Sequence, residues 1–238
     1  MLILALDTCD ARGGVALLRD ESLLHAEPHT ATEDYSSWLL PAITRILTTA
    51  GLGLRDIELY AVAAGPGSFT GVRVGLTTVK AWSEVYGRPI AAVSRLEGVA
   101  GESTGSSPYV AAFIDARRNQ IFAALYRRQA ASLERVDEEM VIAPDKFVEW
   151  GAAKAGSEKI DWLSTDPNCL TQMPNWSSRM TLSETIQEIS PFLAPRIGQI
   201  GYRLACQNRL TDALSLDANY VRRSDAEIFW KAPSRHGA

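Results

Sequence analysis

The sequence predicts an α/β protein with two similar lobes, each with the element order β-β-β-α-β-α. Three observations support this: short apolar runs that suit buried strands, two long segments with helical periodicity, and a strand–Asp–turn–strand pattern that occurs twice. The chain has 238 residues, of which 46% are apolar and 22% charged, so it can bury one large core or two modest ones. The repeated pattern comprises Leu4–Asp7 with Val15–Leu18 and, about 108 residues later, Ala112–Asp115 with Phe122–Leu125.

The first long helix is expected between residues 33 and 50, where apolar residues recur every three to four positions. Thr32 is the expected N-cap. Pro41 lies inside the periodic segment and lacks a backbone N–H, so a kink or a restart of the helix is expected there. Strands are expected before it at Leu2–Leu6, Val15–Leu18 and Ser22–Ala26.

A glycine-rich loop, Gly65-Pro66-Gly67-Ser68-Phe69-Thr70-Gly71, precedes the second long helix. This helix is expected from about Thr70 to Tyr86, because Gly87-Arg88-Pro89 is a typical stop signal. The loop follows a predicted strand at Leu59–Ala64, and another strand is expected at Ile90–Val93.

The two long helices have apolar stripes that can serve either the core or a contact with another protein. Two such helices beside one short strand offer more apolar surface than one small sheet can cover. We therefore predict that part of these faces binds a partner, through Tyr35, Trp38, Leu39, Ile43, Val72, Gly75, Leu76 and Val79.

The second half repeats the hairpin and ends in a long helix. The Gly- and Ser-rich segment Gly101–Ser107 is the expected lobe boundary. The predicted lobes are residues 1–103 and 104–220, followed by a tail at 221–238. The last long helix could pack either on its own lobe or back on the first lobe. Further elements are expected as strands at Tyr109–Asp115, Ile121–Tyr126 and Lys159–Leu163, and as helices at Asp145–Trp150 and, beginning at a proline, Pro191–Gln207.

Composition argues against several classes of function. The formal net charge of −4 is unlike that of a protein that holds nucleic acid unaided, because such proteins carry a basic surface. The three cysteines have long spacings and suggest reduced thiols in a cytosolic, soluble protein without a zinc site. His25 and His29 are four apart, but Pro28 disrupts the helix that would align them as metal ligands. We predict no metal site and no membrane span.

Two features could still form a phosphate or nucleotide cleft. Asp7-Thr8 and Asp115 end strands before hairpins, where two-lobed phosphotransfer folds place a phosphate or metal contact, although turn capping is the alternative. The glycine-rich loop precedes a helix N-terminus and could bind an anion, although a tight packing turn explains it equally well. The candidate cleft residues are Asp7, Thr8, Gly65, Gly67, Ser68 and Asp115.

Several ordered motifs resemble the TsaB (YeaZ-type) family of tRNA threonylcarbamoyladenosine synthesis. They are Leu4-Ala5-Leu6-Asp7-Thr8, Ser36-Ser37-Trp38-Leu39-Leu40-Pro41, the glycine-rich loop with Val72-Arg73-Val74-Gly75, and Asp115-Ala116-Arg117-Arg118. The resemblance implies a duplicated sugar-kinase/actin-type (ASKHA) fold. It also implies a heterodimer with TsaD, the subunit that transfers threonylcarbamoyl to adenosine 37, joined by the ATPase TsaE, and a homodimer when the chain is alone. Tyr35 and Cys9 depart from the family pattern, which often has His and Ser there.

The resemblance and the scarcity of histidine together predict a non-catalytic, activating subunit. It would have no catalytic residues and no cofactor of its own; ATP or ADP is possible only in the complex, and tRNA would be contacted indirectly. One alternative is a stand-alone ATPase or small-molecule kinase that uses Asp7, Thr8 and Asp115. A metallopeptidase is the other alternative.

Overall fold

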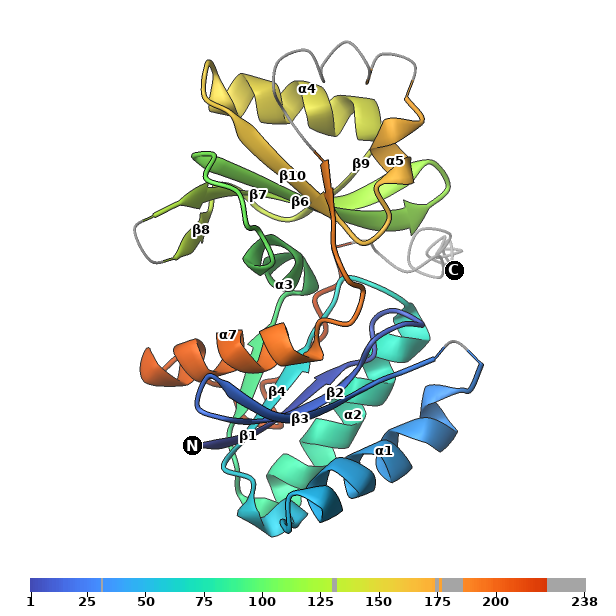
Figure 1. The fold of residues 1–238 in the computed structure, drawn as a ribbon, viewed down its shortest axis with the longest axis vertical. Helices are drawn as coiled ribbons and strands as arrows, with labels where there is room; N and C mark the ends of the chain where they lie inside the picture. The colour runs from blue at the N-terminus through green and yellow to red at the C-terminus, as the bar shows by residue number, and fades with distance from the viewer. Residues whose placement is uncertain (31, 130–131, 174–175, 177–185, 222–238) are drawn as a thin grey trace, which may run out of the picture.

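The computed structural model describes residues 1–30, 32–129, 132–173, 176 and 186–221, which form two lobes with one β-sheet each (Figure 1). Each sheet is built from a hairpin joined to parallel strands. The first has the order β3-β2-β1-β4-β5, with β1 Leu2–Asp7, β2 Gly14–Arg19, β3 Ser22–Pro28, β4 Leu59–Ala63 and β5 Ile90–Val93. The second has the order β11-β10-β6-β7-β8, with β6 Tyr109–Arg117, β7 Gln120–Arg128, β8 Leu133–Arg135, β10 Ile160–Ser164 and β11 Ile186–Glu188; β9 Met140–Ile142 also pairs with β7.

The two sheets share one topology. In the first, β1 is antiparallel to β2 and parallel to β4. In the second, β6 is antiparallel to β7 and parallel to β10. This confirms the predicted duplicated ASKHA-type fold. Each repeat continues beyond the predicted β-β-β-α-β-α order with one more strand and helix. Of these four elements, the sequence predicts the strand at Ile90–Val93 and the last long helix individually.

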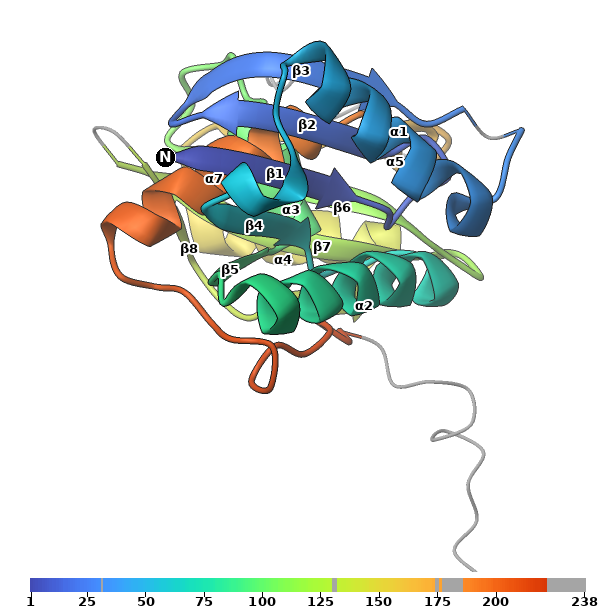
Figure 2. The same ribbon diagram turned by 90° about the horizontal axis from the view of Figure 1, so that it is seen from below.

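The helices form three layers around the sheets (Figures 1 and 2). Helices α1 (Tyr35–Thr49) and α2 (Phe69–Tyr86) cover the outer face of the first sheet. A short 3-10 helix, η1 (Leu54–Asp56), follows α1 in the chain. Helix α4 (Pro144–Ala155) covers the far face of the second sheet, next to α5 (Asn168–Thr171). Helices α3 (Arg95–Gly101) and α7 (Ala194–Cys206) lie between the two sheets.

The last helix of each repeat packs on the sheet of the other repeat. Helix α3 contacts β6, β7 and β10, whereas α7 contacts β1, β2, β4 and β5. The final helix therefore does pack back on the first lobe, as the sequence left open. Because both helices also contact each other, the two lobes share a core through this middle layer.

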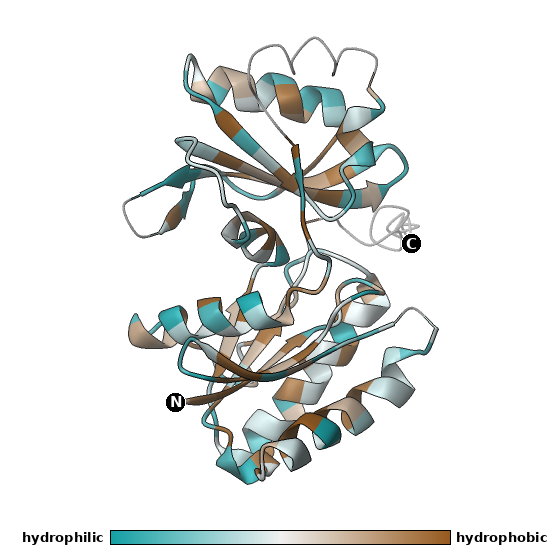
Figure 3. Ribbon diagram, in the orientation of Figure 1, coloured by the Kyte–Doolittle hydropathy of each residue, from teal (hydrophilic) through white to brown (hydrophobic). Residues whose placement is uncertain are grey.

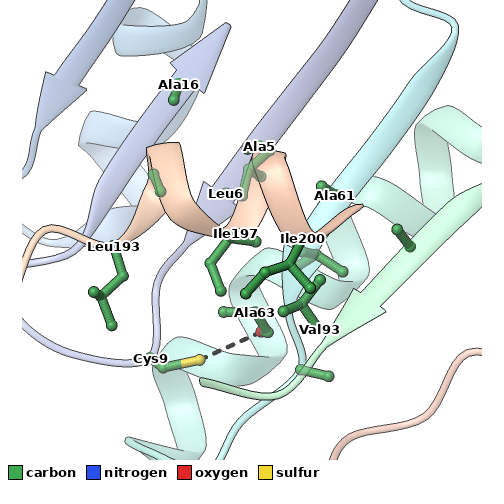
Figure 4. Packing of buried hydrophobic residues seen from close by; sticks show 14 of the residues in the cluster. Ala5, Leu6, Cys9, Ala16, Ala61, Ala63, Val93, Leu193, Ile197 and Ile200 are labelled. Carbon is green, nitrogen blue, oxygen red and sulfur yellow. Dashed lines mark hydrogen bonds between the residues drawn. The ribbon is translucent and has the colours of Figure 1, made fainter. Parts of the chain in front are cut away.

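Small residues bring α7 close to the first sheet (Figure 4). A Cβ at Gly198 would lie 2.3 Å from Leu18 Cδ1, and a Cβ at Gly201 would lie 2.7 Å from Ala61 Cβ. Ile197 and Ile200 flank these glycines on the same buried face. Alternating teal and brown segments along α7 in Figure 3 show that hydrophilic and hydrophobic residues alternate along this helix.

Buried residues form a large cluster and a smaller one. The large cluster runs from α1 and α2 through the first sheet, α3 and α7 to the inner face of the second sheet. The smaller cluster lies under α4, where Trp162 meets Phe147 and Trp176 edge-to-face at centroid distances of 5.6 and 5.9 Å. The core is thus continuous across the predicted lobe boundary.

Three local expectations need correction. Helix α1 begins at Tyr35 with Asp34 as N-cap, so Thr32 is not the cap. The helix continues through the exposed Pro41 without a restart, while the kink stays a prediction. Helix α7 begins at Ala194 with a proline in its first turn, three residues after Pro191. The tail from residue 222 lies outside the described residues.

Candidate functional site

A large open cleft lies between the lobes, where the β1–β2 turn, the glycine-rich loop and the β6–β7 hairpin face one another. Of the predicted cleft residues, Thr8, Gly67, Ser68 and Asp115 line it. Asp7 and Gly65 are buried behind this lining. Arg12 of the β1–β2 turn binds Asp166 of the second lobe at 3.1 Å across the cleft.

Asp7 ends β1 and binds a buried arginine. Its Oδ2 accepts a hydrogen bond from Arg95 Nε at 3.2 Å, and both side chains are at most 1% exposed. Its Oδ1 accepts the backbone N–H of Cys9 at 2.9 Å. Both oxygens of this carboxylate are therefore occupied by donors from the chain itself, which leaves little basis for a direct metal or phosphate contact.

Arg95 also holds neighbouring segments together. Its Nη2 lies 3.6 Å from Asp10 Oδ2 and donates to Pro191 O at 3.5 Å. Its backbone N–H donates to Gly65 O at 2.7 Å. Burial acts to raise the pKa of Asp10, but the positive charges of Arg95 and Arg12 outweigh it and leave this pKa lowered.

The glycine-rich loop is a packing turn against the end of β1. Thr8 is fully buried and donates its hydroxyl to Gly71 O at 2.7 Å. A Cβ at Gly71 would lie 2.0 Å from Thr8 O, and a Cβ at Gly67 would lie 2.4 Å from Cys9 O. Ser68 caps α2 by accepting the Gly71 N–H. Gly67 and Gly71 thus allow close backbone approach, as the packing alternative requires, and anion binding by the loop stays a prediction.

Asp115 occupies the matching place in the second hairpin but remains at the surface. Its Oδ1 accepts the Arg117 backbone N–H at 2.7 Å, and its Oδ2 lies 3.1 Å from Arg117 Nη1. The turn Arg117-Arg118-Asn119 has positive φ at all three residues. Asp115 therefore caps its own turn, as the alternative interpretation held.

An aromatic cluster fixes the β1–β2 turn. Tyr35 donates its hydroxyl to Asp10 O at 2.5 Å and accepts the Gly13 N–H at 3.0 Å. Its ring stacks on His29 at 4.0 Å, and Trp38 packs edge-on against His29. Burial, followed by the charge of Asp7, raises the pKa of Tyr35. Tyr35 thus has a structural role in this chain.

The predicted partner-binding residues lie mostly in the core of the chain. Trp38, Leu39, Ile43, Val72, Gly75, Leu76 and Val79 are all buried, and Tyr35 is half-buried. The reason is that both apolar stripes face the first sheet. Helix α1 contacts β2 and β3, and helix α2 contacts β1 and β4. The outer surface of the two helices instead presents Leu40, Pro41, Thr44, Thr77, Ala81 and Val85.

Sequence reasoning missed Arg95 and Asp10. Arg95 follows the apolar strand β5 and precedes a further apolar stretch, and an isolated arginine in such a run is a signal for a buried ion pair. No local spacing identifies its partner, because Asp7 lies 88 residues away. Within the residues that the structure describes, no group of three or more His, Cys, Asp or Glu side chains could hold a metal ion. His29 instead places Nδ1 2.7 Å from Ala11 O.

The family model for TsaD, tRNA N6-adenosine threonylcarbamoyltransferase, matches residues 24–197. The chain belongs to the TsaD family. Within this family it is of the TsaB, or YeaZ, type. It is 28% identical to the tRNA threonylcarbamoyladenosine biosynthesis protein TsaB of Bacillus subtilis, over 97% of this chain and 98% of that protein. The TsaB of Escherichia coli is 34% identical over 61% of this chain and 64% of its own length.

Solved structures of the TsaB type have the same fold. YeaZ from Pseudomonas aeruginosa superposes with a TM-score of 0.72 at 26% identity, covering 92% of this chain and 99% of that one. A second Pseudomonas aeruginosa structure, described as an uncharacterized protein with similarity to peptidase YEAZ, gives a TM-score of 0.73 at 27% identity and covers 93% and 99%. Both structures therefore share the two-lobed architecture over at least 92% of this chain. No described helix is long and apolar enough to cross a membrane.

Proposed function

We propose that the chain is a non-catalytic, activating subunit of tRNA threonylcarbamoyladenosine synthesis that pairs with a TsaD-type transferase. Its similarity to TsaB of Bacillus subtilis over 97% of the chain supports this pathway. The observation that supports the non-catalytic role is the cleft: Asp7 is paired with Arg95 and Asp115 with Arg117. Each oxygen of both carboxylates already has a donor or a cation from the chain itself.

The partner surface that we propose is the outer side of α1 and α2. Leu40 and Val85 are 55% and 72% exposed there, and Pro41, Thr77 and Ala81 are exposed beside them. Few charged residues interrupt this surface; Arg45, for example, is paired with Glu27 of β3. Small and apolar exposed residues on two neighbouring helices suit a helix-to-helix contact with another subunit. The same surface would serve a homodimer when the chain is alone.

The other expected properties follow from this role. The chain would be cytoplasmic, would meet TsaE only within the assembly and would contact tRNA indirectly, in keeping with its net charge of −4. It would have no cofactor of its own, and ATP or ADP would bind only in the complex. The rival kinase would need Asp7 to release Arg95, and the rival metallopeptidase would need a ligand set that the described residues do not supply.

The decisive experiment mixes the full chain with the TsaD-type transferase of the same organism and measures heterodimer formation by light scattering. Leu40→Asp and Val85→Asp should each weaken assembly without unfolding the chain, because both side chains are already exposed. Leu214→Asp is the matched control, since Leu214 is 89% exposed in the segment after α7. Leu76 is unsuitable for such a test because it is 5% exposed, so a charge there would unfold the chain.

An activity assay separates the subunit role from independent catalysis. Threonylcarbamoyl transfer to tRNA should require the transferase and rise when the chain is added. Modification of tRNA by the chain alone, or an equal rate with and without it, would overturn the proposal. Loss of assembly in Leu214→Asp to the same extent as in Leu40→Asp would overturn the choice of surface.

A further inference from the structure

Three oxygen atoms from two segments, the end of β1 with its turn and the segment before α7, lie near the side chain of Arg95. Asp7 Oδ2 lies 3.2 Å from Nε, Asp10 Oδ2 lies 3.6 Å from Nη2, and Pro191 O lies 3.5 Å from Nη2. Two carboxylates and a backbone carbonyl are the ligand types that Mg²⁺, Ca²⁺ and Mn²⁺ prefer. In this protein the same group of oxygens surrounds a guanidinium.

We propose that Arg95 is a built-in cation that takes the place of a divalent metal ion at the end of β1. The inference rests on the proposed non-catalytic function and extends it: one side chain would exclude a divalent metal ion from the end of β1. Arg95 would then set the specificity of the cleft, and its removal would uncover a latent cation site made by Asp7 and Asp10.

Because Asp7 and Asp10 are shielded from solvent, they need a cation, and Arg95 supplies it in place of a metal ion. Asp7 is fully buried and the side chain of Asp10 is 20% exposed, so two carboxylates share a poorly solvated space. Without Arg95, Arg12 would still pair with Asp10 at 3.3 Å, but the buried Asp7 would lose its cation. A buried carboxylate in that position must take up a proton or another cation. Arg95 cannot lose its own charge, because a guanidinium stays protonated in proteins. One of the two negative charges at the cleft end of β1 is therefore permanently balanced from inside the chain.

The geometry also explains why Arg95 comes from α3. The strand β5 ends at Val93, and α3 begins at Arg95 with its N–H bonded to Gly65 O at 2.7 Å. The side chain then reaches back to β1, while the rest of α3 packs on the second sheet. The cation is thus anchored by both lobes, unlike a metal ion that exchanges with solvent.

The test uses the full chain and Mn²⁺, whose binding is followed by electron paramagnetic resonance. Arg95→Ala should bind about one Mn²⁺ per chain, as a carboxylate-rich site does, and its melting temperature should rise with Mn²⁺. The wild type and Arg95→Lys, which keeps a positive charge, should show neither response. The double variant Arg95→Ala/Asp10→Asn should not bind Mn²⁺, although the single variant Arg95→Ala does.

Each contrary result would overturn the inference. These results are Mn²⁺ binding by the wild type equal to that of Arg95→Ala, no Mn²⁺ binding by Arg95→Ala, or binding that survives Asp10→Asn. If Arg95→Ala folds only when Mn²⁺ is present, the inference is supported; if it stays unfolded with Mn²⁺, a metal cannot replace the guanidinium and the inference fails. Assembly with the transferase is measured separately, so failure of one proposal leaves the other standing.

Discussion

Asp7 ends β1 and Asp115 lies two residues before the end of the corresponding strand β6, yet the first side chain is fully buried and the second is 30% exposed. Both precede a turn, and both bond the backbone N–H two residues later. The first then meets Arg95 from a distant helix, which is 1% exposed, whereas the second meets Arg117 of its own turn, which is 87% exposed. The same local pattern therefore leads to a structural ion pair in one repeat and a surface pair in the other.

The surroundings of the hairpins account for this difference. The β1–β2 turn is covered by Tyr35, by the glycine-rich loop and by the start of α3. The β6–β7 turn reaches into the open cleft. Strand order and direction are thus the same in both repeats, whereas the cover over each turn differs, and we expect this cover to decide how much each carboxylate contributes to stability.

Asp7→Ala tests the comparison with the largest expected effect. It leaves Arg95 buried without its main partner, so we expect a loss of about 3–5 kcal/mol in the free energy of unfolding. Urea denaturation followed by circular dichroism measures it. A loss below about 1 kcal/mol would show that the Asp7–Arg95 pair behaves like a surface pair.

Gly13→Ala probes the close packing of the first turn. The new Cβ would lie 2.1 Å from Asp7 O, so the turn must move, at a cost of about 3 kcal/mol. Asn119→Ala is the matched change in the second turn, where φ is 56°, and it should cost only about 1 kcal/mol. Thermal denaturation shows which variant loses more stability. Equal losses of stability would contradict the expectation that Gly13→Ala costs more than Asn119→Ala.

Tyr35→Phe removes the two hydrogen bonds that tie α1 to the first turn. We expect a loss of about 1–2 kcal/mol at neutral pH. Burial raises the pKa of Tyr35 in the folded chain above the unfolded value of about 10. Stability from the protonated hydroxyl is therefore complete below about pH 10 and is lost as the pH rises, because the unfolded chain releases its proton first.

The stability difference between the wild type and Tyr35→Phe should consequently shrink above about pH 10. Denaturation curves at neutral and alkaline pH measure this, and the remaining tyrosines affect both proteins equally. A difference that stays constant with pH would mean that the Tyr35 hydroxyl is not shielded in the folded chain.

Asp115→Ala has the smallest expected effect. It breaks an exposed ion pair and one turn hydrogen bond, so the loss should stay within about 1 kcal/mol. The same urea titration as for Asp7→Ala measures it. A loss as large as that of Asp7→Ala would remove the distinction between the two hairpins.

Much of the fold could be predicted from the sequence because its main strands are continuous apolar runs. Strands β1, β4, β5 and β10 lie within one or two residues of their predicted ranges, and the Gly87 stop of α2 is confirmed by its left-handed φ of 62°. Helix α3 was missed because it has seven residues and contains Gly98 and Gly101, so packing between the sheets stabilises it more than propensity does. Strands β8, β9 and β11, with three residues each, carry too little pattern.

The site was less predictable, since its decisive contacts join distant segments. Periodicity located the apolar stripes of α1 and α2 but could not show that Leu76 and Val79 face the chain's own sheet. Likewise, nothing in the spacing of Asp7-Thr8 reveals that Arg95 and Gly71 occupy these side chains. Residue types identified the candidates, and only three-dimensional packing assigned their roles.

The exchange of final helices between the sheets also bears on synthesis. The inner face of the first sheet is complete only when residues 194–206 have left the ribosome, although its five strands are made before residue 94. Until then this early half exposes apolar surface, which invites aggregation or chaperone binding. A fragment that stops near residue 103 should accordingly be unable to fold by itself. Cutting the chain there would leave the first sheet without α7 and the second sheet without α3.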